Sequence, residues 1–216
     1  MTAASLEELR IELAPALASA AVWDGWSEAA VRAAAEDNGV DPDAALYAFK
    51  DGAMAMIATW IASVDAAMEA ALPSERLAGM KIRERIRALV QFRLDAVEAN
   101  KEALRRALAI MAMPRNVSTA LKLGWRSADL MWRLAGDTAT DYNHYTKRTI
   151  LASIYGATLA VFVDDSSEDH AETRAFLSRR LDGVMKFEKV KARLLNPERE
   201  HFSPARFLGR LRYPAR

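Results

Sequence analysis

The feature that most constrains the fold of this 216-residue chain is a helical period of apolar residues, which recurs along most of its length. Between residues 82 and 97, for example, apolar residues recur every three or four positions and therefore share one side of a helix. No stretch alternates apolar and polar residues for long enough to predict a strand. Apolar residues make up 51% of the chain, which is enough for a buried core. The sequence therefore predicts an all-α protein.

Glycine, asparagine and proline divide the predicted helices. The helices are expected at 5–22, 27–37, 42–49, 50–71, 79–98, 101–112, 116–135, 140–163, 169–195 and 204–212. We expect three segments: a helix-turn-helix-like part at 1–52, a ligand-binding and dimerisation part at 53–195, and a basic tail at 196–216. The longest uncharged runs, Gly52–Val64 and Thr149–Val163, are shorter than a membrane span, so we expect buried helices there.

The first helices follow an order that resembles the N-terminal end of a bacterial TetR-type repressor. A long helix precedes the turn Trp23–Trp26, and two short helices are joined through Asn38–Pro42. Such a motif binds DNA by placing basic side chains against phosphates. Here Asp24–Asp51 contains seven acidic and two basic residues, a net charge of −5, and the predicted recognition helix contains Asp43 and no base. We therefore expect a degenerate helix-turn-helix that has kept its fold and does not bind nucleic acid.

The later helices are rich in bulky, flexible apolar side chains. Methionine and aromatic walls adapt to irregular apolar ligands, although the same composition is typical of an ordinary core. The TetR-like helix order favours a pocket, because the C-terminal part of that fold commonly contains one. The candidate pocket residues are Met54, Trp60, Phe92, Met111, Met113, Trp125, Trp132, Ile154, Tyr155 and Phe162.

Residues for catalysis are sparse. The chain has no cysteine, and its three histidines, His144, His170 and His201, lack the spacing of a metal-binding motif. An acidic cluster at 164–172 suits either a metal site or the capped start of a helix, and capping by Ser166–Asp169 explains most of it. We therefore expect neither an enzyme nor a bound metal or cofactor.

An unusual polar and aromatic segment begins at Trp132. Two tyrosines and a histidine stand among Asp, Asn and Thr, directly before a strongly apolar helix. Helical spacing predicts that Asp141, Tyr145 and Arg148 share one side. Aromatic residues mixed with Asp and Arg are typical of a partner-binding surface. An ordinary capped helix start explains the same residues equally well.

This segment resembles the coenzyme Q biosynthesis protein nine family. Its members share a Trp, an Ala-Gly-Asp, an Asp-(Phe/Tyr)-Asn-x-Tyr-Thr-(Lys/Arg)-Arg run, an Ile-Tyr and an Asp-Ser-Ser. The corresponding positions here are Trp132, 135–137, 141–148, 154–155 and 165–167. The resemblance implies a dimeric TetR-like fold that binds isoprenoid lipids and presents a quinone intermediate to the di-iron demethoxyubiquinone hydroxylase.

The resemblance also implies a surface on which that hydroxylase docks. By position it falls on Asp129, Met131, Asp141 and Tyr145, and its motif adds Tyr142, Asn143, His144 and Arg148. Many eukaryotic members have Trp where this chain has His144. The N-terminus lacks the basic start of a signal peptide and the arginine-rich character of a transit peptide, which indicates a bacterial member.

The C-terminal tail is basic. Residues 186–216 contain nine bases and three acids, a net charge of +6. Within the predicted helix 204–212, arginines flank an apolar stripe. This pattern is typical of amphipathic helices that bind anionic membrane surfaces. The candidate membrane residues are Arg206, Phe207, Leu208, Arg210, Leu211 and Arg212. The resembled family has a C-terminal amphipathic helix linked to membranes, whereas a tail packed on its own domain or disordered is the alternative.

The sequence thus supports a lipid-binding accessory protein of ubiquinone synthesis. We expect it in the cytoplasm, as a homodimer bound to the inner face of a bacterial membrane. A TetR-type regulator with a hydrophobic ligand is the main alternative, and an uncharacterised α-helical enzyme is the third.

Overall fold

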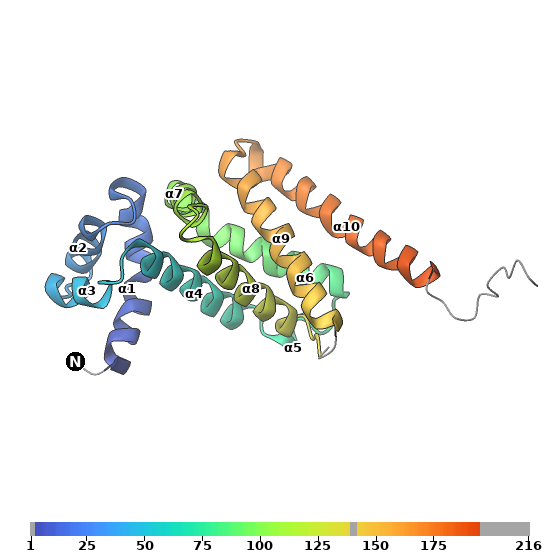
Figure 1. The fold of residues 1–216 in the computed structure, drawn as a ribbon, viewed down its shortest axis with the longest axis horizontal. Coiled ribbons are helices and arrows are strands. Elements are labelled where there is room, and N and C mark those ends of the chain that lie inside the picture. The colour runs from blue at the N-terminus through green and yellow to red at the C-terminus, as the bar shows by residue number, and fades with distance from the viewer. Residues whose placement is uncertain (1–2, 139–141, 195–216) are drawn as a thin grey trace, which may run out of the picture. The chain divides into compact units, whose positions relative to one another are not determined.

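A computed structural model describes residues 3–138 and 142–194, and their regular elements are all helices (Figure 1). The α-helices are α1 (Ala3–Asp24), α2 (Glu28–Asp37), α3 (Pro42–Ala48), α4 (Ala53–Ala71), α5 (Ser74–Leu77), α6 (Ile82–Val97), α7 (Lys101–Met111), α8 (Val117–Leu134), α9 (Tyr142–Asp164) and α10 (Ala171–Leu194). The 3₁₀ turns η1 (Glu98–Asn100) and η2 (Glu168–His170) precede α7 and α10. The all-α prediction is confirmed.

Two local differences from the predicted helices have backbone causes. The helix expected from residue 50 begins only at Ala53, because Gly52 has a φ of +80° and the chain turns there. The short helix α5 was not predicted, since Pro73 precedes it and was interpreted as part of a break. The expected helix 204–212 lies outside the described residues.

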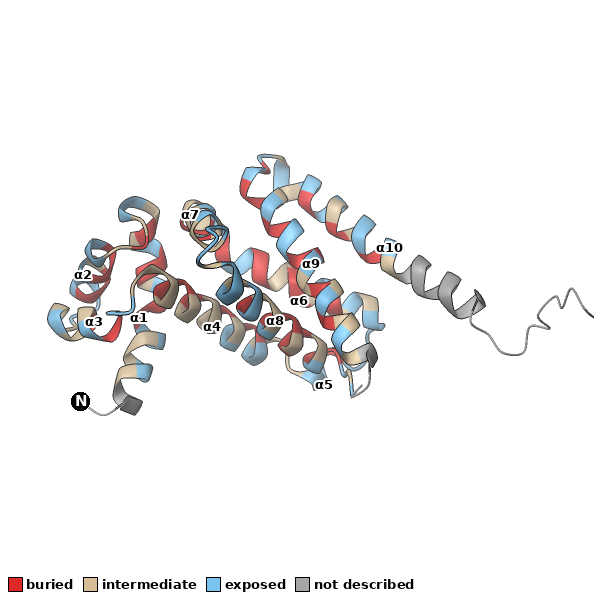
Figure 2. Cartoon of the chain, in the orientation of Figure 1, coloured by how far each residue is buried: buried red, intermediate tan, exposed pale blue. Residues whose placement is uncertain are grey.

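The chain forms two compact units, residues 1–178 and 179–216. Buried and exposed residues alternate along the helices of the first unit, as expected of helices that pack on one side (Figure 2). The described part of the second unit is the C-terminal part of α10. The three-segment division expected from the sequence stays a prediction.

The N-terminal helices have the expected helix-turn-helix layout. Ser27 caps α2 by accepting a hydrogen bond from the backbone N–H of Ala30, and Gly39, with a φ of +65°, turns the chain toward α3. The indole N–H of Trp26 donates to the carbonyl of Ala103 at 3.0 Å, and its ring lies 5.3 Å from that of Trp60. Trp26 therefore fastens this part to α4 and α7 in the same core.

Helix α4 is, within residues 3–138 and 142–194, the one helix long and apolar enough to cross a membrane by length and composition. The helix was predicted at 50–71, but the comparison with a membrane span used only its uncharged run, Gly52–Val64, and the helix continues through Asp65 and Glu69. Its neighbours are α1, α6, α7 and α8. A helix in the core of a protein can have the same length and apolar composition, so these two properties of α4 are weak evidence for a membrane span.

Asp165 organises the corner between α9 and α10. Its carboxylate accepts hydrogen bonds from the backbone N–H and hydroxyl of Ser167 at 2.9 and 2.5 Å, and from those of Thr173 at 2.8 and 2.6 Å. Burial acts to raise the pKa of Asp165, but the hydrogen bonds from Ser167 and Thr173 prevail and hold that pKa well below its ordinary value. The Asp-Ser-Ser sequence is thus a buried cap.

We expect Asp165→Asn to lower the free energy of unfolding at pH 7 by about 2–3 kcal/mol, because the charged acceptor of four hydrogen bonds is lost. A folded-state pKa below the unfolded value gives stability that is present above about pH 4 and is lost as the pH falls. The difference from the parent protein in urea unfolding should therefore shrink between pH 7 and pH 3. Asp164→Asn is the control, since this exposed carboxylate pairs only at the surface with Arg105. A difference that is independent of pH would contradict the assignment.

Candidate functional site

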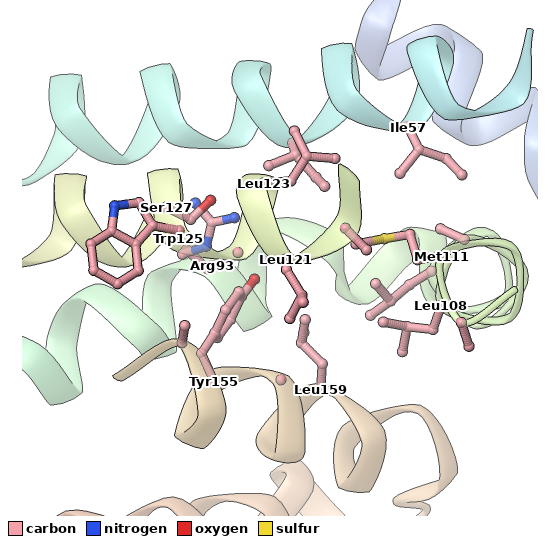
Figure 3. Close-up of a pocket in the computed structure, with 18 of the residues that line it drawn as sticks. Ile57, Arg93, Leu108, Met111, Leu121, Leu123, Trp125, Ser127, Tyr155 and Leu159 are labelled. Atoms are coloured by element: carbon pink, nitrogen blue, oxygen red, sulfur yellow. The ribbon is translucent and has the colours of Figure 1, made fainter. Parts of the chain in front are cut away.

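A cavity of about 480 Å³ lies among α4, α6, α7, α8 and α9 (Figure 3). Its wall is almost entirely apolar: α4 contributes Ile57 and Trp60, and α7 contributes Leu108 and Met111. Cavities of this size and character are typical of binding sites for small apolar molecules. Helix periodicity places these residues on the inner sides of their helices.

The structure brings four of the ten candidate pocket residues into this wall, namely Trp60, Met111, Trp125 and Tyr155. The other six do not line it: Met54, Phe92, Met113, Trp132, Ile154 and Phe162.

The residues outside the wall have other contacts or positions. Trp132 donates its indole N–H to the carbonyl of Lys147 at 3.0 Å, and Phe162 packs edge-on against His170. Ile154 is buried elsewhere in the core, and Met113 is exposed between α7 and α8. Composition does not specify which way each side chain faces, so these residues do not line the cavity, and their assignment to a lipid pocket stays a prediction.

The exposed part of the cavity wall, which we call its mouth, is formed mainly by residues of α8 and α9. Among the residues that line it, Leu121 on α8 is 69% exposed, and Thr149, Ser153 and Gly156 on α9 are also exposed. Gly124 and Gly156 also line the cavity, and a Cβ at either position would meet nothing within 4 Å. Small residues thus leave open the space that larger ones would fill.

One end of the cavity is polar, which the sequence analysis missed. Arg93 is 2% exposed, and its Nη1 donates to Oδ1 of Asp65. Ser127 donates its hydroxyl to Oδ2 of the same carboxylate at 3.1 Å. The guanidinium lies 4.9 Å from the centroid of the Tyr155 ring. Burial acts to lower the pKa of Arg93, but Tyr155 and Asp65 prevail and raise it, so the group stays charged.

A second buried arginine, Arg148, fixes the corner between α8 and α9. Its Nε donates to Asp129 Oδ1 at 2.5 Å, and its Nη1 donates to Asp137 Oδ2 at 2.9 Å and to the carbonyl of His144 at 3.2 Å. Lys147 completes this Arg148 cluster through Asp137 Oδ1, at 2.6 Å. Burial acts to raise the pKa of Asp137, but the hydrogen bonds and charges of Lys147 and Arg148 prevail and lower that pKa.

Gly136 is needed at this corner for a steric reason. Its φ is +87°, and a Cβ there would lie 3.0 Å from Nη1 of Arg85. That nitrogen donates to the carbonyl of Ala135 at 2.8 Å, while the same guanidinium also binds the carbonyls of Ala78 and Met80. The Ala-Gly-Asp sequence therefore joins α8 to the segment before α6 and supplies Asp137 to the Arg148 cluster.

The candidate partner residues divide into buried and exposed groups. Arg148 and Met131 are buried and are not presented at the surface: Arg148 pairs with acids inside the fold, and Met131 belongs to the core. Asp129 is partly exposed and is shared between Arg148 and Arg133. Consequently Tyr145 and Arg148 do not present one common outer side.

Tyr145 remains at the surface. It is 61% exposed, and its ring lies 6.0 Å from that of Trp125 and 5.2 Å from that of His144. These three rings, which we call the aromatic surface, adjoin the cavity because Trp125 also lines it. Tyr142 and Asn143 form the start of α9, whereas Asp141 lies outside the described residues.

Two further segments were considered as sites in the sequence analysis: the basic tail and the acidic cluster at 164–172. The candidate membrane residues 206–212 lie outside the described residues. Within the part of the chain that the structure describes, no three His, Asp or Glu side chains are grouped to hold a metal ion. The acidic cluster at 164–172 instead contains the Asp165 cap and the 3.1 Å contact between His170 Nε2 and Glu98 Oε1.

Comparison with known proteins identifies the family. The COQ9 family model matches residues 117–188. Over 168 residues the chain is 33% identical to the mitochondrial ubiquinone biosynthesis proteins COQ9 of Rattus norvegicus and Homo sapiens, and the match covers 74% of this chain. The chain belongs to the COQ9 family. It spans about half the length of these curated relatives, 54% and 52% respectively.

A solved structure shows the fold of this COQ9 family member. A TetR transcriptional regulator from Nitrosomonas europaea ATCC 19718 superposes with a TM-score of 0.64 at 20% sequence identity, covering 84% of this chain and 99% of its own. The fold is therefore TetR-like, as predicted. The Arg148 cluster and the Asp165 cap both lie within the matched segment 117–188, so the family motif builds these two corners.

We expect Arg148→Met to lower the free energy of unfolding by about 3–5 kcal/mol, because it removes the buried cation that pairs with both Asp129 and Asp137 and leaves Asp137 with Lys147 alone. Arg133→Met is the matched control, since Arg133 pairs with Asp129 while 61% of its side chain is exposed, and it should cost about 1 kcal/mol or less. Urea unfolding at pH 7 measures both. Equal, small effects would show that the Arg148 cluster does not determine the corner.

Proposed function

We propose that this member of the COQ9 family is an accessory protein of ubiquinone biosynthesis. It holds a polyprenyl quinone intermediate in the cavity and presents it to a di-iron demethoxyubiquinone hydroxylase at the membrane. The observation that carries this proposal is the direct contact between the cavity and the aromatic surface, which share Trp125. In this proposal the protein delivers the intermediate and does not catalyse a reaction.

The cavity supports the binding of an apolar molecule. Its walls come from five helices, so a ligand would be enclosed by side chains that the core already orders. Met111 and Leu108 provide adaptable apolar contacts at one end, while the small residues of α8 and α9 leave a way in.

The aromatic surface supports the binding of a protein partner. Exposed tyrosine at the centre of an aromatic group is enriched among residues that dominate binding energy. The buried Arg148 cluster holds the backbone of His144 beneath it, so the surface is ordered before a partner arrives. A hydroxylase bound there would lie beside the cavity mouth.

The basic tail supports weak, reversible contact with an anionic membrane. This contact would place the protein on the inner face of a bacterial membrane, and dimerisation would provide two tails for one surface. Sedimentation of a chain truncated after residue 203 with anionic liposomes tests the tail: undiminished binding would exclude it.

A TetR-type regulator is the alternative with the same fold. The charge of the recognition helix disfavours DNA binding, because α3 has no basic residue. Its exposed Asp43 also lies 3.8 Å from Arg32, which is one of only two basic residues in Asp24–Asp51. A specific shift of promoter DNA at physiological salt would favour this alternative.

We expect Gly156→Leu to weaken ligand binding by about tenfold, because the new side chain fills the open space at the cavity mouth. Leucine is also the better helix former, so α9 should be retained. The measurement is native extraction and mass spectrometry of lipid that purifies with the protein from ubiquinone-producing cells. Ala157→Leu, exposed on the same helix but outside the cavity wall, is the matched control. Absence of an isoprenoid from the parent protein, or equal amounts in all three proteins, would contradict carriage in this cavity.

We expect Tyr145→Ala to weaken association with the hydroxylase about 30-fold, since a central aromatic contact is worth about 2 kcal/mol or more. Biolayer interferometry with purified hydroxylase measures the affinity, and circular dichroism verifies the fold. Tyr47→Ala is the matched control, because Tyr47 is similarly exposed at 58% but lies on α3. Undiminished association of the Tyr145 variant would exclude the aromatic surface as the docking site.

A further inference from the structure

The polar end of the cavity contains a hydrogen-bond donor without a partner. Arg93 uses Nη1 for Asp65, but its Nε is buried and has no acceptor among the described residues. A buried N–H without an acceptor costs free energy, and most such groups in native proteins are satisfied by a partner, a water or a ligand. Arg93 is one of the residues that line the cavity, so a hydrogen-bond acceptor on a bound ligand would lie next to its guanidinium.

Tyr155 adds a second polar group at the same place. Figure 3 shows its ring inside the cavity with the hydroxyl oxygen on the side of Arg93 and Ser127. Ser127 is already committed to Asp65 through its own hydroxyl. The Tyr155 oxygen itself interacts with the Arg93 guanidinium, so the groups that remain for a ligand are the O–H of Tyr155, which can donate, and the unsatisfied Nε–H of Arg93.

The charge of this end limits the chemistry of the ligand. Asp65 balances the charge of Arg93, and Arg93 is the one charged residue among the described residues that line the cavity. An anionic head group would lose its hydration in an apolar cavity and would meet a cation that is already paired. A neutral acceptor, such as a carbonyl oxygen, loses little hydration and satisfies the buried donor.

The apolar end of the cavity determines how an amphiphile would be oriented in it. Figure 3 shows Ile57, Leu108 and Met111 at the end away from Arg93, Ser127 and Trp125. An amphiphile would therefore place its polar head between Arg93 and Tyr155. Trp125 belongs to the same end and contacts Tyr145, so the head would lie beside the aromatic surface.

We propose that Arg93 and Tyr155, with Asp65 as the balancing charge, form a head-group site that selects a neutral carbonyl-bearing amphiphile over a hydrocarbon or a carboxylate of equal length. This inference rests on the proposed function, because it assigns the head-group chemistry of the same cavity. It assigns to Asp65 a specificity role: the carboxylate excludes anions by occupying the arginine.

Three probes with one ring and one tail test the selection: decyl-1,4-benzoquinone, decylbenzene and 4-decylbenzoic acid. Their dissociation constants are measured by displacement of the neutral dye N-phenyl-1-naphthylamine from the full-length protein. We expect the quinone to bind about 10-fold more tightly than either other probe, the gain of one to two hydrogen bonds. Equal affinity of all three would overturn the head-group site while leaving an apolar cavity in place.

Two variants separate the roles of the residues. Tyr155→Phe keeps the ring against Arg93 and should weaken quinone binding about 3- to 10-fold without changing decylbenzene binding. Tyr47→Phe is the matched control, since it removes the same hydroxyl from an exposed tyrosine on α3 that does not line the cavity, and it should leave the affinity for all three probes unchanged. Asp65→Asn leaves the arginine without its balancing charge and should strengthen 4-decylbenzoic acid binding about 10-fold or more relative to the quinone.

The outcomes distinguish this inference from the function on which it rests. Failure of every probe to displace the dye, with no effect of Gly156→Leu, would overturn both the cavity's role and the head-group site. Binding of decylbenzene as tight as that of the quinone, unchanged in Tyr155→Phe, would overturn the head-group site alone. If Asp65→Asn does not fold, the Tyr155→Phe result still decides, because that variant retains every buried charge pair.

Discussion

The buried pairing of Arg148 with Asp129 and Asp137 determines how α8 and α9 meet, and the candidate site depends on that junction. A buried guanidinium is stable only when its charge is balanced and its donors are satisfied, so the cluster fixes one geometry for its helices. These two helices form the cavity mouth, and α9 also bears Tyr145. One electrostatic junction thus positions both the cavity and the surface beside it.

The family motif acquires a physical meaning from this arrangement. Trp132, Gly136, Asp137, Lys147 and Arg148 contact one another or their immediate neighbours at one corner, and Asp165 caps the next. Most of the motif therefore stabilises the fold. Tyr145 is the one large apolar side chain of the motif that is exposed among the described residues, which makes it the candidate contact for a partner.

Asp65 and Arg93 illustrate a second use of buried charge. Their pair stands where the apolar wall of the cavity would otherwise be continuous. Replacing such a pair by apolar residues is often neutral or favourable for stability, so stability alone does not explain it. A role in selecting a ligand head group does explain both the pair and the unsatisfied N–H of Arg93.

The sequence by itself determined the helical architecture, because apolar spacing and capping residues act locally, and the family resemblance rested on the order of residues in 132–167. It also contained an unnoticed indication of the polar end: Asp65 interrupts an apolar helix, and Arg93 stands among the apolar positions of α6. Only the tertiary structure decided that these two charges meet, that Phe92 and Phe162 do not line the cavity, and that Arg148 is buried while Tyr145 is exposed. The reason is that pairing and burial depend on contacts between helices distant in the chain, and spacing within one helix does not specify its rotation against its neighbours.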